Sequence, residues 1–292
     1  KEVDIITIEI ENINVEALEQ LKKENKIVYP QPQVLKIVQD KSLQKEFYFN
    51  NNIPSTPFKI FNSKDEIKKF LSKEGRSYPF IWKSSKMGYD GYGVKVIDNN
   101  NSIEDIPDKH CIIEDKAEIK KELSVMVVSR PSGELINYPV VEMEFNTKTN
   151  QIEYIISPAR ISQEIKEKAE NLALRVCKSF GNIGLLAVEM FLTIDGDLLV
   201  NEVAPRPHNS YHFSIEGSET SQFEQLIRSI LDLPIGNTNM TDKSVMVNLV
   251  GEPDTKGPVV YKNIDQIIGI KGVNPHIYEK KETRPNRKMG HI

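Results

Sequence analysis

The most constraining feature of the sequence is a pair of apolar segments on either side of an Asp-Gly dipeptide, GLLAVEMFLT at 184–193 and LLVNEV at 198–203. This arrangement is a strong signal for a β-hairpin with a two-residue turn. If Asp195 and Gly196 form that turn, Ile194 pairs with Asp197 and, counting outward, Glu189 faces Glu202. Two carboxylates about 5 Å apart destabilise a sheet unless something positive lies between them.

A hard divalent cation is the natural candidate for that position. Mg²⁺ accepts carboxylate oxygens and keeps its remaining sites for water or phosphate, so Glu189 and Glu202 predict a magnesium site used in phosphoryl transfer. The alternative is an exposed pair that solvent holds apart, and the pattern alone leaves both open. A three-residue turn would also break the pairing.

The composition excludes several classes of protein. With 39% hydrophobic and 27% charged residues, a chain of 292 residues predicts a soluble globular enzyme with two or more cores. The formal net charge of −4 gives no general attraction to nucleic acid, so the partner is expected to be small. No long apolar window or signal peptide is visible, which predicts no membrane contact and a cytoplasmic location. Cys111 and Cys177 are expected to be buried thiols.

Periodicity predicts an α/β chain. Strands at 3–10 and KIVYP, with helices after Asn12 and Pro32, indicate the end of an α/β domain, and Ser63 with Glu66 forms a capping box that begins a helix. CIIED at 111–115 and the later strands up to Ser157 predict one antiparallel sheet. Helices are expected at 162–180 and over SQFEQLIRSILDL, and short strands after them. Because the chain opens on a strand pattern and stops at RKMGHI, we expect both ends to be trimmed.

The glycine-rich stretch GYDGYG at 88–93 is a candidate phosphate loop, with Lys83 on the strand before it. Glycines let backbone N–H groups approach phosphate oxygens, and an ammonium adds charge. The VKVI that follows alternates with period two, so the segment is predicted to be a hairpin loop and not a P-loop. An ordinary turn remains the alternative.

Two further clusters have less specific patterns. EDK at 114–116 ends an apolar strand, and Glu122 follows eight residues after Glu114, so backbone groups there could meet an adenine and the Glu122 carboxylate a ribose. RPNRK near the C-terminus could bind a phosphate. Solvated surface charge is the alternative for both.

Taken in order, several motifs resemble those of the 5-(carboxyamino)imidazole ribonucleotide synthase family of ATP-grasp ligases. They are QDKSLQKEF, GYDG, MEF, NEVAPRPHNS, TSQFEQ, VMVNLVGE and RPNRKMGH. The resemblance implies an α/β (α+β) ATP-grasp fold with the remainder of an N-terminal domain at 1–53, a small lid subdomain at 54–118, a large subdomain at 119–236 and a truncated β-rich domain at 237–292. A glycine-rich βα segment that usually begins the family is absent.

The resemblance implies a reaction in which ATP phosphorylates bicarbonate, and carboxyphosphate or CO₂ reaches the amino group of 5-aminoimidazole ribonucleotide. Products are 5-(carboxyamino)imidazole ribonucleotide, ADP and phosphate, in purine biosynthesis. ATP and Mg²⁺ are the implied cofactors, and the family often forms homodimers. The prolines of NEVAPRPHNS fix φ, so that Arg206 and His208 would project at set angles toward developing negative charge.

Carried over position by position, the resemblance assigns residues to four roles. The catalytic set is Arg206, His208, Asn209, Tyr89 and Asp90. The ATP-binding set is Lys41, Lys83, Gly88, Tyr89, Asp90, Gly91, Gly93, Glu114, Asp115, Lys116, Ala117, Glu122, Asn201 and Glu202. The acceptor-binding set is Glu9, Glu11, Ser210, Arg284, Arg287 and Lys288, and the metal ligands are Glu189 and Glu202.

The sequence departs from the family pattern at Met87, Tyr92, Phe145 and Tyr211. Phe145 stands where many members have a nucleotide-contacting histidine. The ring of Tyr211 is expected to narrow the acceptor site, and Tyr92 would replace a cation beside carboxyphosphate. Two alternatives stay open: formate-dependent glycinamide ribonucleotide transformylase, against which RKMGH and GYDG argue, and a nucleotide-binding relative that has lost turnover.

Overall fold

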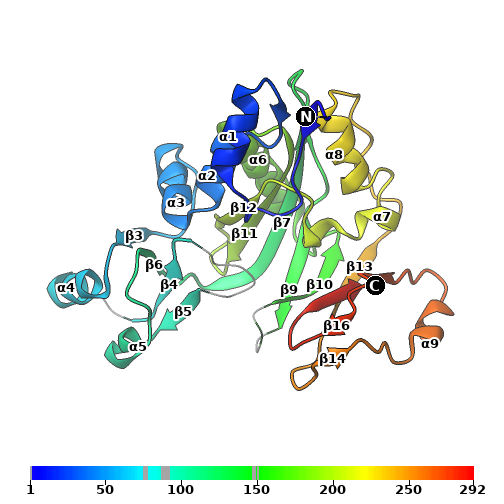
Figure 1. The fold of residues 1–292 in the computed structure, drawn as a ribbon. Helices are drawn as coiled ribbons and strands as arrows, with labels where there is room; N and C mark the ends of the chain where they lie inside the picture. The colour runs from blue at the N-terminus through cyan, green and yellow to red at the C-terminus, as the bar shows by residue number, and fades with distance from the viewer. Residues whose placement is uncertain (1, 75–77, 87–92, 147–148, 150) are drawn as a thin grey trace.

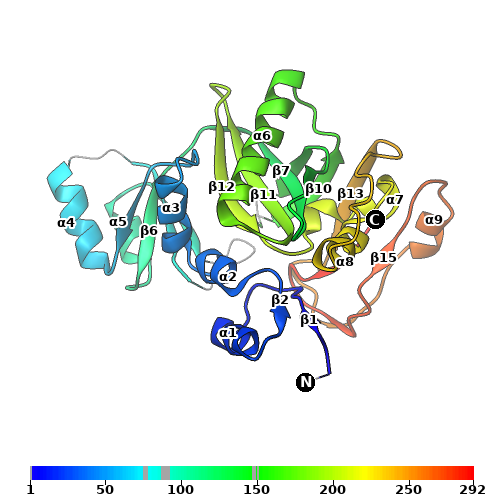
Figure 2. The same cartoon turned by 90° about the horizontal axis from the view of Figure 1, so that it is seen from above.

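The computed structural model describes residues 2–74, 78–86, 93–146, 149 and 151–292. Two antiparallel sheets dominate it, and Figures 1 and 2 show the smaller one with its helices as a lobe beside the larger. The mixed α/β architecture agrees with the predicted fold class. Among the described residues, no helix is long and apolar enough to span a membrane.

The small sheet forms the smaller lobe, which we call the lid lobe after the subdomain predicted at 54–118. Its strands, in spatial order, are β3 (Phe58–Phe61), β6 (Cys111–Asp115), β4 (Phe80–Ser84) and β5 (Val94–Ile97). Helices α4 (Lys64–Glu74) and α5 (Asn100–Glu104) accompany it, and its core surrounds the buried Trp82. The Ser63 hydroxyl accepts a hydrogen bond from Glu66 N, as the capping box predicts. The prediction that CIIED joins the later strands was wrong, because β6 pairs with β3 and β4 instead.

The large sheet has nine strands among the described residues. Its strands run in the order β12 (Leu198–Ala204), β11 (Gly184–Thr193), β7 (Ile119–Ser129), β9 (Val141–Asn146), β10 (Gln151–Ser157), β13 (Ser244–Val250), β17 (Lys288–His291) and β15 (His276–Ile277), and β8 (Leu135–Asn137) also pairs with β7. The predicted helix α6 (Gln163–Phe180) covers one face, packing on Leu186 and Val188. Helix α8 (Gln222–Ile230) packs on Leu185 and Ala187 of the opposite face. Because side chains alternate, Glu189 points to the side away from α6.

The N-terminal segment is less regular than its apolar pattern suggested. The strand expected at 3–10 is only β1 (Ile5–Ile6), which pairs in parallel with β2 (Ile27–Val28). Three helices follow, α1 (Val15–Lys23), α2 (Pro32–Val38) and α3 (Lys41–Asn50). Proline at the first position of α2 occupies the expected place, since its missing N–H would have no partner there.

The C-terminal segment extends the large sheet through β13, β17 and β15. Its connections hold the β14 (Gly257–Pro258) and β16 (Glu282–Thr283) pair and α9 (Ile264–Ile268). Earlier in the chain, 3₁₀-helix η1 (Asn209–Tyr211) and α7 (Ser214–Gly217) lie between β12 and α8. The domain boundaries proposed from the sequence remain predictions.

The hairpin of β11 and β12 confirms the facing glutamates, by a different route from the predicted one. Thr193 N donates to Asp197 O at 2.9 Å and Leu192 pairs with Leu198, so the turn has three residues and not two. That turn alone would bring Asn201 opposite Glu189. A bulge at Asn201 of β12, opposite the step from Glu189 to Met190, shifts the register by one residue, and Glu189 pairs with Glu202. The expectation that a three-residue turn breaks the pairing was therefore wrong, because Asn201 is the extra residue that compensates for it.

Candidate active site

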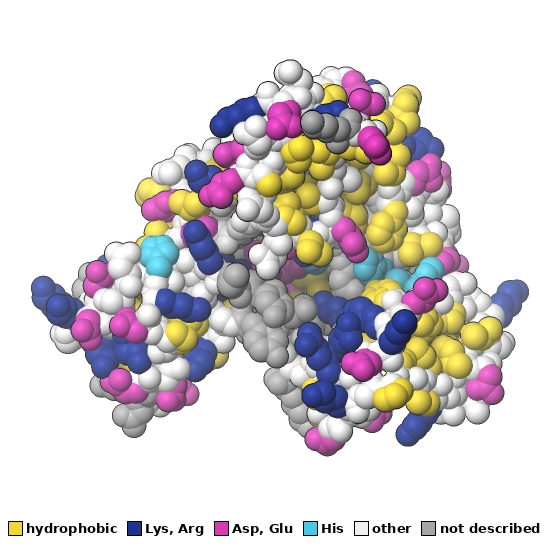
Figure 3. Space-filling model, in the orientation of Figure 1, with side chains coloured by type: hydrophobic (Ala, Val, Ile, Leu, Met, Phe, Trp, Pro, Cys, Tyr) yellow, Lys and Arg dark blue, Asp and Glu magenta, His cyan; other side chains and the backbone are white. Residues whose placement is uncertain are grey.

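A cavity of about 1460 Å³ lies between the lid lobe and the large sheet. Figure 3 shows the hollow between the two parts, with Lys and Arg side chains on its rim. Residues assigned from the sequence meet here from segments far apart in the chain. Those that line it are Glu11, Lys41, Lys83, Glu114, Asp115, Lys116, Ala117, Glu122, Glu189, Asn201, Glu202, Arg206, His208, Asn209 and Lys288.

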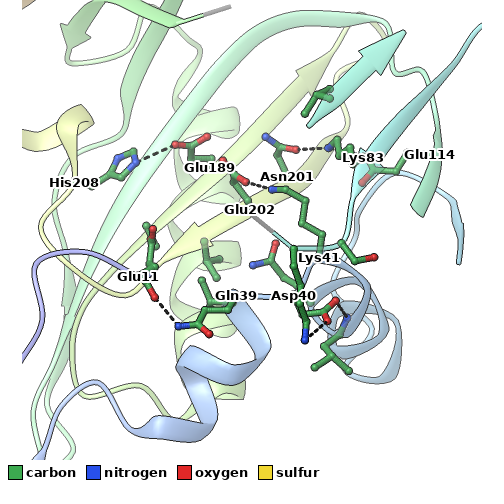
Figure 4. Close-up of a pocket in the computed structure, with 18 of the residues that line it drawn as sticks. Glu11, Gln39, Asp40, Lys41, Lys83, Glu114, Glu189, Asn201, Glu202 and His208 are labelled. Carbon is green, nitrogen blue, oxygen red and sulfur yellow. Dashed lines mark hydrogen bonds and ion pairs between the residues drawn. The ribbon is translucent and has the colours of Figure 1, made fainter. Parts of the chain in front are cut away.

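Lys41 and Glu202 form an ion pair at the centre of the cavity, with Nζ 2.5 Å from Oε2 (Figure 4). Lys41 is the first residue of α3, where the side chain of Asp40 caps the helix by accepting from Ser42 N at 3.0 Å. The cap fixes where the helix begins and therefore where the Lys41 side chain starts. The Lys41 ammonium is the largest influence on Glu202, and it lowers the pKa of that carboxyl to about 2.

Glu189 is in the opposite electrostatic situation. Burial, then the charges of Glu202 and Glu122, raise its pKa well above the usual range. Burial and Glu202 also raise the pKa of Glu122 to about 7. Of two neighbouring carboxylates, the one beside Lys41 thus has a lowered pKa while the other has a raised pKa, as expected for like charges that share a site.

Lys83 is held by a buried carboxylate behind it. Its Nζ lies 3.0 Å from Glu114 Oε2 and 3.1 Å from Asn201 Oδ1, so it bridges the small sheet and the bulge of β12 (Figure 4). Glu114 is 2% exposed, and it also meets Lys45 Nζ at 3.4 Å and the Thr56 hydroxyl at 2.7 Å. Burial would raise the pKa of Glu114, but Lys83 and Lys45 outweigh it and lower that pKa.

The loop that follows β12 brings Arg206 and His208 into the cavity. Arg206 pairs with Glu11 Oε2 at 3.0 Å, and the Gln39 side chain donates to Glu11 O at 2.6 Å, so the N-terminal segment is fastened where Arg206 reaches it. Burial, then the charges of Arg206 and Lys288, lower the pKa of His208 to about 3, so the imidazole is neutral.

The tautomer of His208 follows from its neighbours. Ser210 N donates to His208 Nδ1 at 3.4 Å, and a backbone N–H can only donate, so the ring proton belongs on Nε2. That nitrogen lies 3.2 Å from Glu189 Oε1 (Figure 4). The neutral ring can therefore offer an N–H to an anion in the cavity.

Ser210 and Tyr211 do not line the cavity. The Ser210 hydroxyl lies 2.8 Å from His208 Nδ1, so it orients that ring from behind. Tyr211 is fully buried, and its hydroxyl donates to Ser124 O at 2.9 Å and Pro139 O at 2.8 Å. The expectation that the Tyr211 ring narrows the acceptor site was wrong, because the ring points into the core.

Three other assigned residues lie outside the lining. Glu9 and Arg284 are exposed, and Arg287 donates to Glu282 O at 2.7 Å. Gly93 has φ of +80° and accepts from Ser84 N at the end of the glycine loop. Gly88, Tyr89, Asp90 and Gly91 lie outside the described residues, as do Met87 and Tyr92. Phe145 lines the cavity.

Two buried residues near the site, Lys45 and Thr56, were not identified from the sequence. Lys45 is 2% exposed, and its Nζ meets the Thr56 hydroxyl at 2.8 Å as well as Glu114. Burial, only partly offset by Glu114, lowers the pKa of Lys45 to about 8. The available signal was the spacing, because Lys45 follows Lys41 by four residues and so shares its helix face.

Models of known families match three parts of the chain. Residues 1–39 match the ribonucleotide synthetase preATP-grasp domain, 46–223 the ATP-grasp domain, and 244–292 the phosphoribosylaminoimidazole carboxylase C-terminal domain. N5-carboxyaminoimidazole ribonucleotide synthase of Bacillus subtilis is 39% identical over 99% of this chain and 74% of its own length. The chain belongs to the N5-carboxyaminoimidazole ribonucleotide synthase family.

Solved structures of this family share the fold. The synthetase of Thermotoga maritima is 39% identical, with a TM-score of 0.88 over 99% of this chain and 75% of its own. The synthase of Aspergillus clavatus, in complex with ADP and 5-aminoimidazole ribonucleotide, is 31% identical, with a TM-score of 0.87 over 99% of this chain and 76% of its own.

Some family members are considerably longer. Phosphoribosylaminoimidazole carboxylase of Candida glabrata is 37% identical over 99% of this chain, which spans 52% of that protein. The chain thus spans about half the length of the first curated relatives it matches and about three quarters of the bacterial synthase.

Proposed function

We propose that this chain carboxylates 5-aminoimidazole ribonucleotide with bicarbonate at the expense of ATP, through carboxyphosphate. The products are 5-(carboxyamino)imidazole ribonucleotide, ADP and phosphate, a step of purine biosynthesis. Membership of the synthase family and the Aspergillus complex with ADP and the ribonucleotide support this activity. The observation that carries the proposal is a single cavity shared by the facing Glu189 and Glu202, the lysines Lys41 and Lys83, and the Arg206–His208 loop.

ATP would lie along the inner edge of the lid lobe. The strand end at 114–117 would offer backbone groups to the adenine, and Glu122 on β7, which lines the same cavity, would take the ribose hydroxyls. Lys41 and Lys83 would meet the phosphates. Each lysine already has a carboxylate partner, so each ammonium is held in place before the nucleotide arrives.

The residues present also fit a Mg²⁺ ion. The buried Glu189 and the partly exposed Glu122 and Glu202 bring together negative charge that Lys41 only partly offsets, which is the situation a divalent cation relieves. Among the described residues there is no cluster of three or more acidic, histidine or cysteine ligands. Two carboxylates with the remaining positions left to water and phosphate suit Mg²⁺, which would neutralise charge on the transferred phosphoryl group.

In the first step, a bicarbonate oxygen would attack the γ-phosphorus, the bond to the β-phosphate oxygen would break, and ADP would leave. Arg206 and the Nε2–H of His208 line the cavity and would stabilise the negative charge that develops there. Glu11 holds the Arg206 side chain in place and Ser210 orients the His208 ring, so little reorganisation would be needed at the moment of reaction.

In the second step, the acceptor's amino nitrogen would bond to the carboxyl carbon while phosphate leaves and the nitrogen loses a proton. Lys288 lines the cavity at its C-terminal side and would meet the phosphate of the ribonucleotide. Glu11 also lines the cavity, where its carboxylate could accept a hydrogen bond from the acceptor.

ADP release tests this proposal directly. With Mg²⁺ and ATP, release should require bicarbonate and 5-aminoimidazole ribonucleotide together, and Glu202→Gln should lower it about 10³-fold, a loss of about 4 kcal/mol in transition-state stabilisation. Release that depends on formate and glycinamide ribonucleotide would identify the transformylase instead. ATP binding without acceptor-dependent release would identify a relative without turnover.

We also propose that two copies associate through α8. Phe223, Ile227 and Leu231 recur every fourth residue and are 40%, 49% and 48% exposed, which forms an apolar stripe on a helix whose other face is buried. The Ile227→Glu variant should elute as a monomer in light-scattering chromatography, whereas Val260→Glu, at an exposed apolar position in the C-terminal segment, should not change the mass. The cytoplasmic location remains a proposal from the sequence.

A further inference from the structure

Two sequence motifs have no part in the chemistry proposed above, TSQFEQ at 220–225 and VMVNLVGE at 245–252. Each contributes one buried amide to the loop that carries His208 and Asn209. Gln222 is 0% exposed and Asn248 is 6% exposed, and neither lines the cavity. Burying an amide is costly unless its polar atoms find partners, so the partners are informative.

Gln222 holds the backbone of His208 on both sides. Its Oε1 accepts from His208 N at 2.8 Å, and its Nε2 donates to His208 O at 3.0 Å. The second hydrogen of Nε2 reaches His212 Nδ1 at 2.9 Å. Turning the amide over would bring its oxygen against a carbonyl oxygen and its nitrogen against an N–H, so only one orientation satisfies these partners.

Asn248 holds the side chain of Asn209 by a reciprocal pair of amide hydrogen bonds. Asn209 Nδ2 donates to Asn248 Oδ1 at 2.8 Å, and Asn248 Nδ2 donates back at 2.9 Å. Asn248 Nδ2 also donates to Ile152 O at 2.9 Å, a group that can only accept. This fixes which end of Asn248 faces Asn209 and joins the loop to strands β10 and β13.

We propose that Gln222 and Asn248 are positioning residues for the carboxylation, Gln222 by fixing the backbone of His208 and Asn248 by fixing the amide of Asn209. The inference rests on the proposed function, because it assigns a purpose to the same loop. It makes helix α8 and strand β13 necessary for the chemistry although neither residue lines the cavity.

The chain supplies a matched control in the same motif. Gln225 is also 0% exposed on α8, and it too fixes a backbone on both sides, accepting from Gly236 N at 3.0 Å and donating to Gly236 O at 2.5 Å. Gly236 does not line the cavity. Loss of either glutamine removes comparable hydrogen bonds, but only Gln222 is bonded to a residue of the site.

The first experiment compares acceptor-dependent ADP release by Gln222→Leu and Gln225→Leu, each corrected for the folded fraction. Gln222→Leu should lower kcat about 100-fold, the cost of misplacing a catalytic group by about 1 Å, with KM for ATP unchanged. Gln225→Leu should keep the wild-type kcat. If either leucine variant fails to fold, the isosteric Gln222→Glu and Gln225→Glu pair makes the same comparison. Equal losses in the two variants would overturn the inference.

A second experiment does not need activity. In ¹⁵N-histidine spectra of the whole chain, the Nε2–H tautomer signal of His208 should shift in Gln222→Leu and remain in Gln225→Leu. If the wild type has no turnover while the signals behave in this way, the proposed function fails, and what stands is that Gln222 fixes His208. If the wild type turns over and neither kcat nor the His208 signal distinguishes the two variants, the positioning role fails alone.

Discussion

Glu114 and Glu189 are two buried glutamates that line one cavity, yet their surroundings shift their pKa values in opposite directions. Glu114 has Lys83 at 3.0 Å, Lys45 at 3.4 Å and the Thr56 hydroxyl at 2.7 Å, and these partners lower its pKa in spite of burial. Glu189 has the neutral His208 at 3.2 Å, and burial with the charges of Glu202 and Glu122 raises its pKa well above the usual range, although Lys41 and Lys288 act in the other direction.

The difference separates a carboxylate that is paired with side chains of the protein from one that would be paired with a ligand. The chain's own cations neutralise Glu114, and under the proposed function this carboxylate would hold Lys83 where a phosphate lies. Lys41 and Lys288 offset the charge of Glu189 only in part, so under the proposed function a bound cation would neutralise the rest. A buried carboxylate is thus informative through its partners more than through its burial.

Replacement of Glu114 should have the largest effect on stability. Glu114→Gln leaves Lys45 and Lys83 buried without their carboxylate, and breaking a buried pair in this way costs about 3–5 kcal/mol of the free energy of unfolding. Glu189→Gln is the matched control, and it should leave that free energy unchanged or raise it. Urea denaturation of the two variants measures this, and equal losses would abolish the distinction drawn above.

Glu142 extends the comparison to a third buried glutamate. It accepts hydrogen bonds from Arg160 Nη2 at 2.5 Å and from Lys121. Burial raises the pKa of Glu142, but these hydrogen bonds outweigh burial and lower that pKa to about 2. Because the folded pKa lies below the unfolded value of about 4.5, its stabilisation is complete above pH 4.5 and lost as the pH falls toward 2. The loss is at most about 3 kcal/mol, less because Arg160 is largely exposed.

Urea titrations at pH 5 and pH 3 measure this effect. The wild type should lose more stability between the two pH values than Glu142→Gln does, since the variant has no carboxylate to protonate. A common acid slope for the two proteins would show that Glu142 is not held ionised by its partners.

The coupling between Lys45 and Glu114 should be the smallest of these effects. Removing both members of a buried pair leaves no unpaired charge between them, so Lys45→Met with Glu114→Gln should cost less than the sum of the single changes, by about 0.5–3 kcal/mol. A double-mutant cycle measures this coupling. Simple additivity would mean that Lys83 alone keeps Glu114 ionised.

The sequence predicted the elements that have strong local signals. Periodicity identified β11 and α6, and the Asp-Gly turn led to the facing Glu189 and Glu202. The turn length and the bulge at Asn201 could not be predicted, because they depend on how β12 fits the rest of the sheet. Cys111 was placed in the wrong sheet for a similar reason, since an apolar strand does not specify its partner.

The sequence also did not predict which residues far apart in the chain contact one another. Lys45, Thr56 and Glu114 come from three segments, and only the fold brings them together. Gln222 and Gln225 did carry a signal: two amides, three residues apart, lie on the face of α8 that also buries Leu226 and Ile230. A polar residue on a buried face requires partners, but the sequence does not say which.

The central claim is that the charge of Glu189 and Glu202 is completed by a divalent cation. Thermal unfolding with fixed ADP and increasing Mg²⁺ tests it most directly, using wild type, Glu189→Gln and the distant Glu142→Gln. A ligand at 100 times its Kd stabilises the folded state by about 2.7 kcal/mol, so Mg²⁺ should raise the Tm of wild type and Glu142→Gln but not that of Glu189→Gln. An equal rise in all three would contradict the account.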